Sequence, residues 1–377
     1  MRSPTAAGGV FVRDWVPTWP TSAAFALLIL IAIAGLALWW RRAAVPPVQR
    51  PRLRLGVVAL VAGLLGIYGA YYDAAWHLQW GRDTFWSPPH VLIYGGIALV
   101  LVVAVLALLA LRPLGRTWGE RMRQAPAVGW VAAIAVAQLA AAPFDEAWHR
   151  IFGRDVTAFS PPHLVLAVGF TIVFLAAGAV LLGLRPRGYR GLLLVLVAVS
   201  LAMVQMMVIE HELPVGPDHP VARRWSYFYP LLTVLAMAAY LTLAVRLVQH
   251  PWAATGAALL FMALRLPAIA ILAATGFQAL PALPPPLVLP ALAIDLWWQR
   301  SRGRPPLTAA LAGAAAALVY HLVAYPWARD VAGLPLLDPR VLLTWAPLGI
   351  ALAAAIATLA WAFGGWLATE GAVGAGD

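Results

Sequence analysis

The chain contains no cysteine and no lysine, and only 11% of its 377 residues are charged. The absence of cysteine excludes disulfides and thiolate metal sites, so any metal must be held by histidine, carboxylate, methionine or backbone oxygen. Soluble domains carry about 25% charged residues, whereas 63% of this chain is hydrophobic. This composition excludes an ordinary soluble domain and favours a protein embedded in a lipid bilayer.

Apolar runs of roughly 20 residues, the length that a helix needs to cross the hydrocarbon core, repeat along almost the whole chain. We therefore expect an all-α, polytopic integral membrane protein with about 11 transmembrane helices, forming one transmembrane domain over residues 1–377. The first apolar run shows no small-residue cleavage site, so it is interpreted as a retained helix and not as a signal peptide. The expected helices cover residues 22–40, 55–73, 90–111, 127–149, 162–184, 191–211, 227–247, 252–275, 285–298, 307–326 and 341–363.

All 26 basic residues are arginines, and most of them lie in short loops between the apolar runs. The net charge of +11 is explained by the positive-inside rule and does not indicate nucleic-acid binding, because no separate basic domain is present. The rule places the arginine loops at the cytoplasmic side of the cell membrane, with the N-terminus outside and the C-terminus in the cytoplasm. Most histidines and carboxylates then gather at the outer face, and His250 lies at the inner one.

One polar motif interrupts the apolar runs twice. Residues 73–90 read DAAWHLQWGRDTFWSPPH, and residues 145–163 read DEAWHRIFGRDVTAFSPPH, with one residue inserted before the serine. Such self-similarity is typical of repeated supersecondary units. It divides the chain into hairpin repeats at residues 55–111 and 127–184, a degenerate third repeat at 191–247 and a helical scaffold at 252–377.

The first copy of the motif combines residue types that bind transition metals. Asp73 and His77 lie four residues apart at the expected outer end of a helix, so both project from one face. The segment Ser87-Pro-Pro-His90 predicts a helix start, with Ser87 as N-cap and His90 in the first turn. A short turn would bring His90 back towards Asp73 and His77. Two imidazoles and one carboxylate form a set suited to copper, non-haem iron or zinc.

The second hairpin offers the same residue types, and each hairpin adds an Arg-Asp pair that could orient the ligands or balance their charge. The third repeat keeps acids and histidines without the spacing, which is more typical of a solvated outer loop. His321, inside a later apolar run, is either a functional intramembrane group or a core histidine whose hydrogen bonds are satisfied. The candidate ligands of the second hairpin are Asp145, His149 and His163. The Arg-Asp pairs that could orient the ligands are Arg82 with Asp83 and Arg154 with Asp155. The weaker candidates are Glu210, His211, His219 and His321.

At these residues the chain resembles the C subunit of the copper membrane monooxygenases, the particulate methane and ammonia monooxygenases. That family carries an Asp-x3-His-x12-His copper site, with a tryptophan before the first histidine, an Arg-Asp pair after it and Thr/Ser-Pro-x-His at the end. The matching residues are Asp73, Trp76, His77, Arg82, Asp83, Ser87, Pro88 and His90. The resemblance implies that Asp73, His77 and His90 hold copper and that a small substrate is oxidised by dioxygen. It also implies other membrane subunits or a soluble electron donor as partners.

Two other functions stay open. A transporter or metal-handling protein would use the same Asp and His groups for the passage of a cation or of protons. A structural partner subunit would use them only to hold the hairpin, with Asp73 and His77 hydrogen-bonded to each other. Arg265 and Asp295 also lie within apolar runs, where they either pair with each other or face a cavity.

Overall fold

The computed structural model describes residues 18–80, 86–152, 159–212, 228–278, 280–301, 305–332 and 339–373. Every regular element within these ranges is helical. The α-helices are α2 (Trp19–Arg42), α3 (Arg50–Trp80), α4 (Pro88–Ala110), α5 (Trp118–Gln124), α6 (Pro126–Phe152), α7 (Pro161–Leu184), α8 (Tyr189–Met206), α10 (Phe228–Val248), α11 (Ala253–Ala274), α12 (Val288–Arg300), α13 (Pro305–Pro326) and α14 (Pro339–Val373). Short helices of other types are η1 (Pro47–Gln49), η2 (Arg112–Leu114), η3 (Ile209–Glu212) and η4 (Trp327–Val331).

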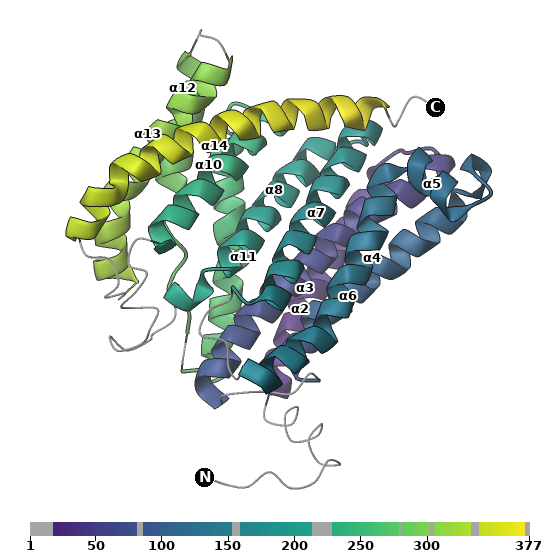
Figure 1. The fold of residues 1–377 in the computed structure, drawn as a ribbon, viewed down its shortest axis with the longest axis horizontal. Coiled ribbons are helices and arrows are strands. Elements are labelled where there is room, and N and C mark those ends of the chain that lie inside the picture. The colour runs from purple at the N-terminus through teal and green to yellow at the C-terminus, as the bar shows by residue number, and fades with distance from the viewer. Residues whose placement is uncertain are drawn as a thin grey trace, which may run out of the picture.

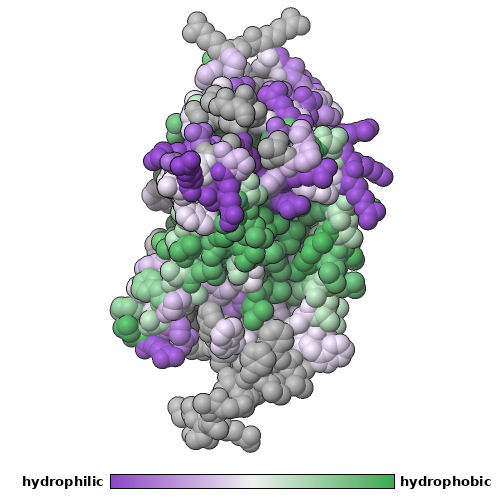
Figure 2. Space-filling model, turned by 90° about the vertical axis from the view of Figure 1, so that its right-hand side faces the viewer, coloured by the Kyte–Doolittle hydropathy of each residue, from purple (hydrophilic) through white to green (hydrophobic). Residues whose placement is uncertain are grey.

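Ten helices in the described part of the chain are long and apolar enough to cross a membrane. On the side that Figure 2 displays, a belt of hydrophobic side chains lies between two more hydrophilic ends. A helix satisfies its own backbone hydrogen bonds, which is what a segment in lipid requires. The prediction of an all-α polytopic membrane protein is therefore confirmed.

Each expected helix has a counterpart, but several differ in length from the expectation, and α14 continues to Val373, ten residues beyond the expected end at residue 363. Helix α3 continues to Trp80, about two turns beyond the expected end at residue 73. Helix α12 has only 13 residues, a length of about 20 Å against the roughly 30 Å of a hydrocarbon core. A proline-rich segment without regular structure, residues 280–286, precedes α12. The ninth expected helix, at residues 285–298, thus begins only at Val288 and is too short to cross the hydrocarbon core by itself.

Helix α5 is an element that the apolar pattern did not predict, because it is short and polar. Thr117 accepts a hydrogen bond from the backbone N–H of Glu120, and the Glu120 carboxylate accepts one from the backbone N–H of Thr117. This reciprocal capping box satisfies amides that the first helical turn leaves without partners. Helix α5 therefore forms a polar cap next to the start of α6.

The arginines at the helix ends identify one end of the molecule, called here the arginine-rich end. The Trp39 indole near the end of α2 donates to the carbonyl of Arg187 between α7 and α8, and Arg121 of α5 donates to the carbonyl of Leu108 near the end of α4. Helix α5, α12 and the C-terminal end of α14 all lie at the top of Figure 1. The two copies of the polar motif lie at the opposite end, called here the motif end.

Helix α3 lies in the centre of the bundle and packs against α2, α4, α7, α8 and α11. Helix α6 lies further out and packs against α4, α5 and α7 (Figure 1). On the other side of the bundle, α14 crosses α7, α10 and α13 at a steep tilt (Figure 1). The first hairpin, α3–α4, is therefore enclosed by protein to a greater extent than the second, α6–α7.

Candidate metal centre

Asp73 and His77 are held by the helical part of α3 and not by its frayed end. Because α3 continues to Trp80, both residues lie within its regular hydrogen-bonded turns. The carboxylate oxygen Oδ1 of Asp73 lies 3.4 Å from Nε2 of His77, one turn further along the same face. The long helix thus fixes the direction of two candidate ligands.

His90 is the third residue of α4, which begins at Pro88 with Ser87 in the N-cap position. The helix start was predicted correctly, but the Ser87 side chain makes no capping hydrogen bond. Prolines occupy the first two helical positions and have no N–H to donate, which leaves the N–H of His90 as the one donor that such a cap could use. Their fixed backbone angle favours a helix start directly after Ser87, and this places His90 in the first turn.

Gly69 explains how the start of α4 reaches Asp73. A Cβ atom at Gly69 would lie 3.0 Å from the carbonyl oxygen of Pro89 and 2.6 Å from Cγ1 of Ile93. Only glycine leaves room for this approach of α4 to α3. Gly69 is one helical turn before Asp73 and on the same face of α3, so the contact brings His90 beside the carboxylate.

Three candidate ligand atoms consequently converge on one point. Nε2 of His90 lies 3.4 Å from Oδ1 of Asp73, and one ligand atom from each of Asp73, His77 and His90 lies within 4.8 Å of the other two. Two ligand atoms bound tetrahedrally to one metal at about 2.1 Å lie about 3.4 Å apart. The two distances to the Asp73 carboxylate therefore fit a shared cation.

The Asp73 carboxylate is enclosed, since Oδ1 is buried and makes no hydrogen bond with any residue that the structure describes. A buried carboxylate oxygen without a hydrogen bond is costly unless a positive charge lies beside it. That charge can come from a metal ion or from a protonated imidazole. The side chains of Asp73, His77 and His90 are 21%, 26% and 17% exposed, which leaves an approach from the motif end.

Aromatic side chains surround the α3 side of this cluster. Trp76, next to His77 in sequence, is 4% exposed and contacts both Tyr72 and Trp80 in edge-to-face geometry. Phe277, from the segment after α11, contacts Tyr72 and Trp80. Such packing restricts the motion of the end of α3 and separates the Asp-His face from the centre of the bundle.

The second hairpin brings together at least two of its three candidates. Oδ1 of Asp145 on α6 lies 3.5 Å from Nε2 of His163 on α7. The Asp145 side chain is 9% exposed and that of His163 is 31% exposed. The side chain of His149 lies outside the described part of the structure. Asp145 and His163 thus repeat the arrangement of Asp73 and His90 across the second hairpin.

The Arg-Asp pairs and one histidine of the third repeat lie outside the described residues. These are Arg82, Asp83, Arg154, Asp155 and His219, and the side chain of Glu210 is likewise not described. His321 is buried in α13 at 7% exposure, and its Nδ1 lies 2.6 Å from the carbonyl oxygen of Ala317. Within the described ranges, His321 joins no cluster of metal-binding side chains, so a core histidine bonded to its own helix describes it best.

The expectation of a solvated outer loop at the third repeat is wrong for the residues that the structure describes there. His211 is 3% exposed and its ring contacts those of Phe228 and Tyr229. Glu212 is completely buried. Both side chains contact residues at the start of α10, so they belong to the protein interior and not to a surface loop.

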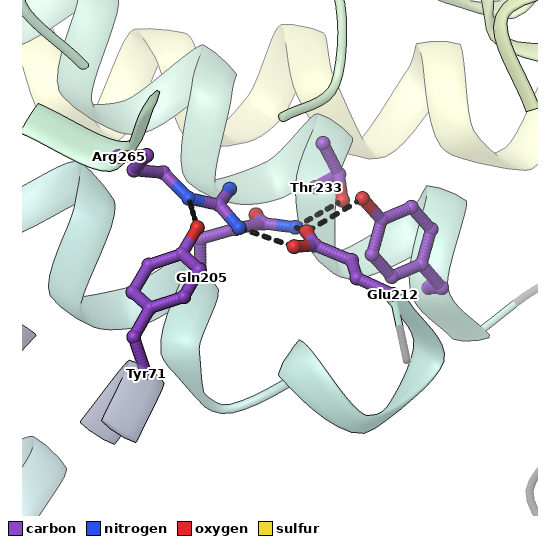
Figure 3. A network of polar contacts seen from close by, with 6 residues as sticks. Tyr71, Gln205, Glu212, Thr233 and Arg265 are labelled. Atoms are coloured by element: carbon purple, nitrogen blue, oxygen red, sulfur yellow. Dashed lines mark hydrogen bonds and ion pairs between the residues drawn. The ribbon is translucent and has the colours of Figure 1, made fainter. Parts of the chain in front are cut away.

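Glu212 forms an ion pair with Arg265, and this is the polar site that sequence reasoning missed. The guanidinium also donates through Nε to the hydroxyl of Tyr71, and the Tyr229 hydroxyl donates to Oε1 of Glu212 at 2.8 Å. Figure 3 shows these side chains converging from α3, α8, η3, α10 and α11, together with Gln205 and Thr233. Buried charges require such partners, so the network joins the first hairpin to the rest of the bundle.

Arg265 and Asp295 do not pair, and neither alternative expected for them describes Asp295. Its carboxylate accepts hydrogen bonds from the backbone N–H groups of Ala254 and Thr255 at the start of α11. A carboxylate is favourable there because a helix N-terminus has unpaired N–H groups and a positive dipole. The positions of the two residues along the span would have indicated this difference. Arg265 lies about 18 Å along α11 from Ala253, whereas Asp295 lies at the arginine-rich end.

The fold and the clustered side chains together define an integral membrane protein with a candidate metal centre in its first hairpin. No protein-family model matches the chain, and no curated protein or solved structure matches it significantly. Its function is therefore inferred from its own residues.

Proposed function

We propose that this protein is a membrane metalloprotein that holds a copper ion between Asp73, His77 and His90 and oxidises a small substrate with dioxygen. The observation that carries the proposal is the convergence of one carboxylate and two imidazoles at metal-ligand spacing. The motif resemblance to the copper membrane monooxygenases favours copper over iron or zinc. Copper bound by these ligands, with coordination positions left open, would supply the redox chemistry that side chains lack.

The residues of the chain have distinct roles in this proposal. Asp73 supplies negative charge that offsets part of the cation's charge in a half-buried site. The two imidazoles bind as neutral ligands, each from a different helix, so that the hairpin sets their mutual orientation. The aromatic packing of Trp76 restricts the motion of the α3 face that carries both Asp73 and His77.

Metal analysis of the purified protein tests the proposal. Protein produced with copper is expected to retain at least one copper ion per chain, with an electron paramagnetic resonance spectrum typical of nitrogen and oxygen ligands. The His77→Ala variant should lose that ion and its spectrum. His250→Ala, which changes an exposed histidine at the other end of the protein, is the matched control and should retain both.

Two outcomes would contradict the proposal. Wild-type protein without stoichiometric copper, iron or zinc would mean that Asp73 is balanced by a protonated histidine, as expected for a purely structural hairpin. Retention of the metal by both His77→Ala and His90→Ala would place the site elsewhere. Iron or zinc in place of copper would keep the metal centre but contradict the proposed oxidation by copper.

A transporter is the second candidate, and the segment without regular structure before the short helix α12 favours it. The backbone N–H of Ala282, in that segment, donates to the carbonyl of Glu212, beside the buried Glu212–Arg265 pair. Non-helical backbone beside intramembrane charges is typical of transporter binding sites. Weakly held, exchangeable metal together with uptake into proteoliposomes would favour this function, whereas a tightly held redox-active metal would favour the oxidase.

A further inference from the structure

A groove at the arginine-rich end is separate from the candidate metal centre. It encloses about 530 Å³, and α7 lies between its two walls, α6 and α14. Helix α7 contributes alternating small and branched side chains from Ile172 to Leu184. The groove is lined by Arg52, Gln124, Ala125, Pro126, Ala127, Val128, Trp130, Ile172, Leu175, Ala176, Ala179, Val180, Gly183, Leu184, Phe363, Trp366 and Leu367.

The length of the groove corresponds to one leaflet of the bilayer. Along α7 it extends from Ile172, near the middle of the helix, to Leu184 at its end, a rise of about 18 Å. One leaflet contributes about 15 Å, half of a hydrocarbon core of roughly 30 Å. A transmembrane helix of a partner would require a groove along the whole span, so the length fits an acyl chain better.

The polar side chains of the groove lie at its arginine-rich end. Arg52 is in the first turn of α3 and Gln124 is the last residue of α5, and Arg52 is the only charged residue among those that line the groove. An anionic group at the mouth of the groove would lie beside this cationic side chain at the depth of the lipid headgroups, where arginines attract anionic lipids.

Two tryptophans at the same end support a position at the membrane interface. Trp130 on α6 is 62% exposed and Trp366 on α14 is 54% exposed, and both line the groove. Tryptophan prefers the headgroup level, where its ring meets apolar chains and its N–H meets polar groups. The groove thus has an apolar floor below this level and a cationic side chain at it.

We propose that this groove binds an anionic glycerophospholipid, with an acyl chain along α7 and the phosphate beside Arg52. Length, apolar lining and a single cation at the headgroup level are the features that a lipid of this class would recognise. The proposal does not depend on the metal centre, which lies at the opposite end of the bundle.

Native mass spectrometry of the full-length protein tests it, with vesicles of equal parts phosphatidylglycerol and phosphatidylcholine as the lipid source. Wild-type protein extracted in mild detergent should retain at least one phosphatidylglycerol, in preference to phosphatidylcholine. Arg52→Gln should reduce that preference about fivefold, the effect expected of one arginine near an anionic surface. Arg54→Gln, on the same turn of α3 but exposed and outside the groove, should leave it unchanged.

A second pair of variants tests the apolar part without changing charge. Ala176→Trp fills the groove and should displace the retained lipid, whereas Val168→Trp, 56% exposed on the same helix but outside the groove, should not. Equal retention of the two lipids by wild-type protein, or lipid retention by Ala176→Trp as by wild type, would overturn the proposal. A dimer that Ala176→Trp dissociates would overturn it too, because a second copy would then cover the groove.

Discussion

Helices α3 and α6 carry the same aromatic pattern in different surroundings, with one ring per turn over three turns: Tyr72, Trp76 and Trp80 on α3, and Phe144, Trp148 and Phe152 on α6. On α3 the first ring is fully buried, and Phe25 of α2 and Phe277 both contact it. On α6 the corresponding Phe144 is 46% exposed and Phe152 is 65% exposed. One motif can therefore occupy an enclosed position or a peripheral one.

The residue two positions before the aspartate also differs between the hairpins. In α3 it is Tyr71, whose hydroxyl accepts the hydrogen bond of Arg265. In α6 it is Pro143, which has no such group. The first hairpin is thus tied to the buried ion pair. In the second hairpin, Gln138 donates a neutral hydrogen bond to the carbonyl of Leu166 within the hairpin itself. Sequence similarity alone does not make the two sites equivalent.

The largest effect on this comparison is expected from Arg265→Met. The substitution leaves the Glu212 carboxylate buried without its partner, which costs about 3–5 kcal/mol in the free energy of unfolding. Gln138→Leu, in the second hairpin, removes one neutral hydrogen bond and should cost about 1 kcal/mol. Reversible unfolding in mixed detergent micelles measures both values. Equal losses for the two variants would mean that the ion pair does not distinguish the hairpins.

Removal of the middle aromatic ring, Trp76 or Trp148, should also affect the stability of the two hairpins differently. Trp76→Ala opens a cavity between α3 and its neighbours, because Trp76 is 4% exposed, and should lower the free energy of unfolding by about 3 kcal/mol. Trp148→Ala should lower the free energy of unfolding clearly less, since Phe144 and Phe152, the rings one turn before and after it on α6, are exposed. The same unfolding measurement applies, and a larger loss for Trp148→Ala would indicate that a partner subunit covers α6.

Metal affinity offers a third comparison. His90→Ala should weaken metal binding at the first hairpin by at least about 100-fold, because changes in groups that merely orient a ligand already cost 10- to 100-fold. His163→Ala should leave the affinity of that site unchanged, although it shares the position of His90 in the motif. Competition titration with a metal chelator measures both. Equal weakening by the two variants would point to one shared site.

The smallest effect is expected from Gly69→Ala. A methyl group there meets the Pro89 carbonyl, so the start of α4 must shift and His90 must move with it. Metal affinity should fall about 10-fold, the lower end of the losses seen when ligand orientation is disturbed. Gly95→Ala is the matched control, because its added methyl group meets no atom within 4 Å. An unchanged affinity in Gly69→Ala would show that α4 tolerates the shift.

Close approach of the two helices also recurs in the second hairpin, where Gly169 of α7 takes the place of Gly96 of α4. An added Cβ at Gly96 would lie 3.2 Å from the Ala62 carbonyl oxygen, and one at Gly169 would lie 2.4 Å from the Gln138 side chain. These glycines are a second sequence feature, besides the polar motif, that indicates the internal repeat. Ala141 takes the place of Gly69 in the second hairpin, and Asp145 and His163 still approach to 3.5 Å there.

The sequence by itself determined the class of the protein, because a helix that crosses lipid must be long and apolar wherever it lies in the bundle. It also determined that Asp73 and His77 share a face and that α4 begins before His90, since both follow from local spacing and from proline. Helix α5 was less accessible, because a short polar helix lacks a long apolar run.

Only the tertiary structure decided which polar groups meet. Arg265 had carboxylates available on either side in the sequence, and the nearer of them, Asp295, is not its partner. The packing of η3 against the start of α10 selected Glu212, while Asp295 accepts hydrogen bonds from the start of α11. Similarly, the aromatic rings of two nearly identical motifs are more enclosed on α3 than on α6 because α3 lies in the centre of the bundle. Local pattern fixes the face that a side chain occupies, whereas its neighbours depend on contacts between helices far apart in the chain.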